Sequence, residues 1–182
     1  MSEVQFTRAL NPSAELNATE SRAANDAYAD FLRESDQSTS GDLLRYFGRD
    51  FFHDGSMSAV VVDADTASFS FRTKCENVQR PDRMSVQPAP QFDVRFENVV
   101  EFAWASGRPG QRIFVGAEID GLPDSISDAE ARHSTKFHSL VIDAYGESFQ
   151  VVFTAVRVNP TDPVSWTSIL ANPELQVLGL FE

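Results

Sequence analysis

The string with the most chemical potential is Phe51–Ser56, which places an imidazole, a carboxylate and a hydroxyl close together. An imidazole oriented by a carboxylate can act as a general base, and functional residues are common on loops held by a rigid scaffold. The structural alternative is that Asp54 and Ser56 bond to backbone groups of a turn, while Gly55 supplies a positive φ. Neighbouring side chains on an extended chain point apart, which predicts no dyad between His53 and Asp54. We favour the structural interpretation, with no catalytic residue. If the pair has a function, we expect binding.

The other two histidines, His133 and His138, raise the question of a metal site, because imidazole and carboxylate both bind divalent ions. Their spacing matches no helical ligand pattern, and His138 falls on the apolar side of a predicted strand, which favours a hydrogen-bonded core residue. We therefore predict no metal site and no cofactor. The carboxylates that would complete such a site are Glu118, Asp120 and Asp143.

Cys75 is the single cysteine, so an intrachain disulfide is excluded. Its neighbours Lys74 and Glu76 would shift the thiol pKa in opposite directions, which does not favour a reactive thiolate. The sequence also contains no nucleophile-elbow, phosphate-loop or dinucleotide-binding pattern. These observations lower the expectation of an enzyme without removing it.

The charge balance favours some partners over others. The chain has 27 acidic and 15 basic residues and a net charge of −12. Such a surface repels phosphate backbones and speeds association with basic proteins. No stretch approaches about 18 consecutive apolar residues, and no signal-peptide pattern begins the sequence. We expect a soluble, cytoplasmic protein that binds neither nucleic acid nor membrane.

Helical periodicity is confined to the first quarter of the chain and to a segment near its end. Residues 1–12 are predicted as a flexible arm and residues 13–47 as helical, with a short second helix from Asp42 to Phe47. A last helix should start at Asp162-Pro163, and it is followed by an apolar tail that should be buried within the chain or against another subunit. The apolar residues of that tail are Leu175, Val177, Leu178, Leu180 and Phe181.

Between these regions the apolar residues recur with a period of two. Residues 57–62 and 67–73 should form a hairpin, and residues 76–91 a long loop. The clearest strand is 92–104, in which one parity is apolar and predicted to be buried, with a bulge or bend at Asn98. Further strands are expected near 113–119, 138–142 and 149–158. The buried parity of strand 92–104 comprises Phe92, Val94, Phe96, Val100, Phe102 and Trp104.

These patterns predict a single α+β domain over residues 1–182. We expect a twisted antiparallel sheet or open barrel of about six strands over residues 56–158, with the N-terminal helices packed on one face. Residues 163–182 should contain the C-terminal helix and the apolar tail.

At Phe52-His53-Asp54-Gly55, followed by a hydrophobic hairpin, the chain resembles small bacterial proteins grouped with polymorphic-toxin immunity proteins. An aromatic-His-Asp step before the first strand is typical of such proteins. The likeness continues through residues 92–99 and 140–158 in pattern alone. The resemblance implies a non-catalytic inhibitor and assigns no site residue.

Three functions remain open. The first is a cytoplasmic binding protein, such as an immunity-type inhibitor whose acidic surface meets a basic protein partner. The second is an enzyme or small-ligand-binding protein with a pocket near His53 and Asp54. The third is a structural protein that self-associates, with a homodimer formed through the C-terminal tail.

Overall fold

The computed structural model describes residues 42–47, 51–106, 114–121, 138–144 and 147–180, together with Asp26, Asp30 and Arg33, which are helical. The whole predicted arm (residues 1–12) and most of the predicted helical region 13–47 lie outside the described residues. The described elements are α2 (Asp42–Phe47), β1 (Met57–Asp63), β2 (Ser68–Lys74), β3 (Val78–Gln79), β4 (Gln91–Glu97), β5 (Glu101–Ser106), β6 (Phe114–Gly121), β7 (His138–Ala144), β8 (Glu147–Phe153), β9 (Ala155–Pro160), α3 (Pro163–Leu170) and β10 (Gln176–Val177).

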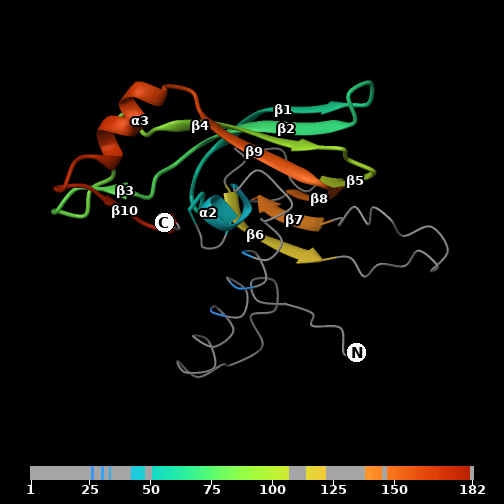
Figure 1. Cartoon of the computed structure of the whole chain (residues 1–182), viewed down its shortest axis with the longest axis horizontal. Coiled ribbons are helices and arrows are strands. Elements are labelled where there is room, and N and C mark those ends of the chain that lie inside the picture. The colour runs from blue at the N-terminus through green and yellow to red at the C-terminus, as the bar shows by residue number, and fades with distance from the viewer. Residues whose placement is uncertain are drawn as a thin grey trace.

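The predicted α+β class with antiparallel strands is confirmed. Two four-stranded antiparallel sheets have the orders β1-β2-β4-β9 and β5-β8-β7-β6, and β3 pairs with β10. We refer to the four-stranded sheets as the first and the second sheet. Figure 1 shows them as two layers, with α2 at one side of the gap between them and α3 at one end of the first sheet. The described strands outnumber the predicted six because two predicted strands are each divided between the sheets, and because the short strands β3 and β10 were not predicted.

The predicted strand 92–104 is one of these, and predicting it as continuous was wrong. Its first half is β4 in the first sheet, and its second half is β5 in the second sheet. The chain changes sheet at Asn98, which has a left-handed φ of 53°, so the predicted bend is confirmed. The return crossing lies at Thr154, between β8 and β9. Asn98 Nδ2 donates a hydrogen bond of 2.8 Å to Thr154 Oγ1, so the two crossings hold each other.

Burial along this segment follows the prediction only as far as the crossing. Phe92, Val94 and Phe96 are fully buried, and Asp93 and Arg95 are exposed, as alternation predicts. The predicted burial of Val100 and Trp104 is wrong, because these residues are 64% and 55% exposed. After the crossing the chain is an edge strand of the second sheet, where the first sheet no longer covers its whole apolar face.

Helix α2 fills one side of the gap between the sheets. It forms at the predicted bounds, buries Leu43, Tyr46 and Phe47, and packs against β9 and β6, the edge strands of the two sheets. Its first residue, Asp42, also accepts a hydrogen bond of 2.7 Å from the backbone N–H of Val158 in β9. We call this helix-covered side, between β9 and β6, the closed side.

An aromatic cluster next to α2 anchors the turn that leads into β1. The rings of Phe51 and Phe92 pack edge to face at 5.4 Å, and Trp166 of α3 meets Phe92 at 5.0 Å. Helix α3 begins as predicted, because Asp162 caps it by accepting a hydrogen bond from the backbone N–H of Ser165, with proline at its first position.

The predicted loop 76–91 contains the short strand β3, which periodicity did not indicate because the strand has only two residues. Its partner is β10 in the C-terminal tail, and the N–H of Leu178 donates to Asn77 O. Leu175, Val177 and Leu180 are partly buried against the core. The tail therefore pairs within the chain, which was one of the two alternatives predicted for it. Phe181 lies outside the described residues.

Candidate functional site

The His53–Asp54 corner differs from the extended geometry that we expected. Residues 51–54 form a turn, and Asp54 adopts a left-handed φ of 64°. This backbone brings the two side chains together, with His53 Nδ1 at 3.1 Å from Asp54 Oδ2. The prediction that these side chains point apart was therefore wrong, because the chain turns at the position where alternation was assumed.

The role predicted for Gly55 was also wrong. The left-handed residue of the turn is Asp54, and the φ of Gly55 is not positive. Glycine is required at position 55 because a Cβ there would lie 2.0 Å from the carbonyl oxygen of Lys74. The backbones of the turn and of β2 approach so closely that no side chain fits between them.

The corner presents an imidazole–carboxylate pair to solvent. The side chains of His53 and Asp54 are 45% and 73% exposed, and Asp54 is the only described residue in a hydrogen bond or ion pair with the His53 ring. The backbone beneath is anchored, since Phe51 O accepts hydrogen bonds from Cys75 Sγ and Asn77 Nδ2. The pair can bind a ligand or transfer a proton, but no described hydroxyl completes a triad with it.

Cys75 lies beneath this corner and is fully buried. Burial raises the pKa of its thiol to about 12, and the neighbouring charge of Glu76 acts in the same direction. The thiol is therefore protonated at neutral pH, in agreement with the prediction that it is not a reactive thiolate.

Of the residues considered for a metal site, the side chains of Glu118 and Asp120 in β6 and of His138 and Asp143 in β7 lie outside what the structure describes. His133 lies outside the described residues. His138 begins β7, where its backbone pairs with Gly121. Within the described part of the chain, no three His, Cys, Asp or Glu side chains are grouped so that they could hold a metal ion.

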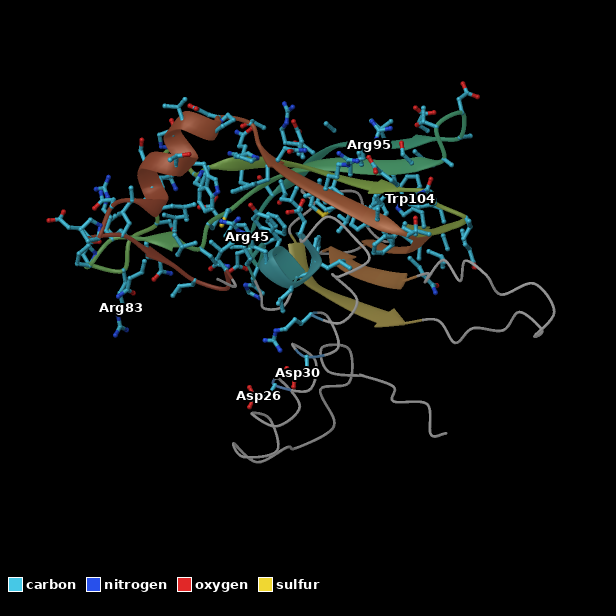
Figure 2. The ribbon with its side chains drawn as sticks, viewed as in Figure 1. Asp26, Asp30, Arg45, Arg83, Arg95 and Trp104 are labelled. Atoms are coloured by element: carbon cyan, nitrogen blue, oxygen red, sulfur yellow. The ribbon has the colours of Figure 1, made fainter. Side chains whose placement is uncertain are left out.

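The sequence did not predict the exposed apolar surface on the side of the gap opposite α2, between the edge strands β1 and β5. Three exposed apolar side chains contribute to it. Val100 lies in the crossing to β5, Trp104 lies in β5, and Val62 of β1 is 52% exposed. Figure 2 shows Trp104 far from α3, toward the other end of the sheets. We call this surface the open rim; it consists of Val62, Val100, Phe102 and Trp104.

Ring contacts show that the open rim adjoins the hydrophobic core. Phe69 is fully buried in β2 and meets the half-buried Phe102 ring at 5.0 Å. Val62 is the ladder partner of Phe69 and so shares its face of the first sheet. Trp104 stacks on Phe149 at 6.2 Å with an interplanar angle of 13°. The open rim is thus a continuation of the core that stays accessible to solvent.

The outer face of the first sheet carries an ordered row of charges. Arg72 forms a bidentate ion pair with Asp93, with hydrogen bonds of 2.8 and 3.1 Å, and Arg157 forms an ion pair with Glu97 at 3.0 Å. Arg95, labelled in Figure 2, donates to the hydroxyl of Thr66. Two of these three arginines thus form ion pairs with carboxylates, and the face is not a uniform basic stripe of the kind that binds nucleic acid.

Comparison with known proteins adds no relative: no protein-family model matches the chain, and no curated protein matches it in sequence. Among the helices that the structure describes, none has the length and apolar character needed to cross a membrane.

Proposed function

We propose that this protein is a non-catalytic binding protein that engages a basic protein partner through the open rim. The observation that carries the proposal is the 55% exposure of Trp104, stacked on a buried phenylalanine at the mouth of the core. Large aromatic side chains held rigidly at a surface are the residues on which binding energy concentrates. The side chain of Trp104 is oriented by its stacking, so it loses little conformational freedom on binding.

Charge supports a basic partner. The net charge of −12 attracts a cationic protein over long range, and Glu101 adds an exposed carboxylate between the two apolar residues Val100 and Phe102. A carboxylate on the same strand as exposed apolar side chains matches a partner surface that combines lysine or arginine with apolar groups. An immunity-type inhibitor, which the sequence resembles around His53-Asp54, is the kind of protein that we propose. Its site of action is the cytoplasm.

The protein encoded by the adjacent gene is the first partner to test. We expect an upstream toxin gene whose product is basic and forms a stable complex with this chain, measured by light scattering and calorimetry. Trp104→Ser should weaken the complex at least about tenfold. Val164→Ser is the control, because Val164 is also an exposed apolar residue, at 77% against 55% for Trp104, but lies on α3. Equal affinity for both variants would refute binding at the open rim.

A small-ligand site at the corner is the second candidate, favoured by the 3.1 Å contact between His53 and Asp54. A metabolic operon around the gene would support it. In that case, His53→Ala should abolish ligand binding or turnover, and Trp104→Ser should not affect either.

A further inference from the structure

We propose that β5 binds an extended segment of the basic partner as an added β-strand. This inference rests on the proposed function and specifies how the open rim is used. In the order β5-β8-β7-β6, β5 is an edge strand, and its pairing with β8 runs without a register shift from Glu101 to Ser106. In such a ladder every second residue of an edge strand directs its N–H and C=O away from the sheet.

Comparison with the other edges shows that β5 is the exception. β1 is interrupted by a bulge between Ser58 and Val61, where Ala59 has a left-handed φ of 49°. β6 has a register shift between Phe114 and Gly116. In β9 the outward N–H of Val158 is bonded to Asp42 of α2. Bulges and covering elements are the devices by which proteins prevent unwanted pairing at sheet edges.

β5 carries none of these devices in the described part of the chain. It contains neither lysine nor proline, and its exposed residues Ala103 and Ala105 are small enough for another backbone to approach. Glu101 is its only charged residue. Of the four edges of the two four-stranded sheets, three are protected, and the fourth is regular and bordered by the open rim. This is the arrangement expected of a strand that receives a partner.

Charge decides between a basic segment and a second copy of this chain. A second copy brings a net charge of −12 against the same charge, and these charges repel. A basic segment is attracted instead and can place lysine or arginine beside Glu101. Because side chains alternate along a strand, its apolar residues would lie along the row of Val100, Phe102 and Trp104, with basic residues on the other face.

The test uses the full chain and a fluorescent peptide that alternates lysine and valine over about eight residues, a common strand length. A second peptide has the same side chains but carries N-methyl groups on alternate amides, which removes the hydrogen-bond donors of one edge. We expect the unmethylated peptide to bind and methylation to weaken binding at least about tenfold. Hydrogen exchange should slow at the amides of β5 (residues 101–106) and remain unchanged in β1 (residues 57–63), the matched edge with a bulge.

Each other outcome is decisive. If methylated and unmethylated peptides bind equally, side chains alone make the contact and strand addition is wrong, while binding at the open rim stands. If the unmethylated peptide fails to bind up to about 1 mM, or protects β1 instead, the inference is overturned. If the free protein is a dimer whose β5 amides lose protection on dilution, the occupant is a second copy and not a basic segment. Failure of the adjacent-gene experiment would refute the proposed function separately.

Discussion

The two sides of the gap between the sheets differ in whether their apolar side chains are buried. On the closed side, α2 inserts buried aromatic and aliphatic side chains between β9 and β6. On the open rim, between β1 and β5, Val62, Val100 and Trp104 remain exposed. Exposed apolar surface costs about 25 cal/mol for each Å² that burial would have removed from water. Under the proposed function, the closed side serves stability and the open rim serves binding.

The strongest test of this contrast compares one aromatic residue from each side. Phe92→Ala removes a fully buried ring that packs against Phe51 and Trp166, and should lower the free energy of unfolding by about 3–5 kcal/mol. Trp104→Ala should lower it by less than about 1 kcal/mol, because that ring is more than half exposed. Urea denaturation measures both. Equal losses would mean that the open rim is part of the stabilising core.

Gly55 offers a second comparison, since its close neighbours are Lys74 and Thr73 of β2 and Phe52 of its own turn, and no residue of the open rim. Gly55→Ala places a Cβ 2.0 Å from a backbone oxygen of β2, so the chain must move. We expect a loss of about 1–3 kcal/mol in the free energy of unfolding and no change in partner affinity. Ser58→Ala, at an exposed position of β1, is the control and should change stability by less than about 0.5 kcal/mol. A neutral Gly55→Ala would show that the close approach to β2 is readily relaxed.

The crossing at Asn98 connects the two sides. Asn98→Ala loses the hydrogen bond to Thr154 and places alanine at a left-handed φ, which together should cost about 1–2 kcal/mol of unfolding free energy. Asn98→Gly keeps the backbone conformation and should cost less. A double-mutant cycle with Thr154→Val isolates the side-chain bond. Additive effects of Asn98→Ala and Thr154→Val would argue that the two crossings are not coupled.

The smallest effect concerns pH and helix α3, which covers the end of the core near Phe92. Hydrogen bonds from the Ser165 hydroxyl and then from its backbone N–H lower the pKa of Asp162. A carboxyl whose pKa is lowered on folding stabilises the fold above its unfolded pKa of about 4, and this contribution is lost as pH falls through the lower folded pKa. Asp162→Asn should therefore have a lower melting temperature than wild type at neutral pH, with the difference shrinking below about pH 4. A constant difference would contradict the assignment.

Local sequence patterns predicted the secondary-structure elements well. They failed where a contact with a residue distant in the sequence determines the structure. The bounds of α2, the cap at Asp162 and the bend at Asn98 follow from short patterns of apolar, capping and turn residues. The division of residues 92–104 between sheets could not be predicted, because the same parity is apolar on both sides of Asn98. Trp104 has the same parity as the buried Phe96, and only the position of the first sheet distinguishes them.

The corner failed for a related reason. Alternation was applied to His53 and Asp54, although the left-handed φ of Asp54 turns the chain between them and the strand. The need for glycine at position 55 comes from the backbone of Lys74, far away in sequence, and not from any local turn rule. The open rim likewise depends on which edge α2 covers, a fact of tertiary packing.

The paired crossings at Asn98 and Thr154 have a consequence for how the protein unfolds. β4 pairs with β9 and β5 pairs with β8, so one continuous two-stranded ribbon belongs to both sheets. Neither sheet can separate from the other without breaking the ribbon that forms part of its own hydrogen-bonded ladder. We therefore expect the two sheets to unfold in a single cooperative transition. Local unfolding at an edge of one sheet should also destabilise the other sheet.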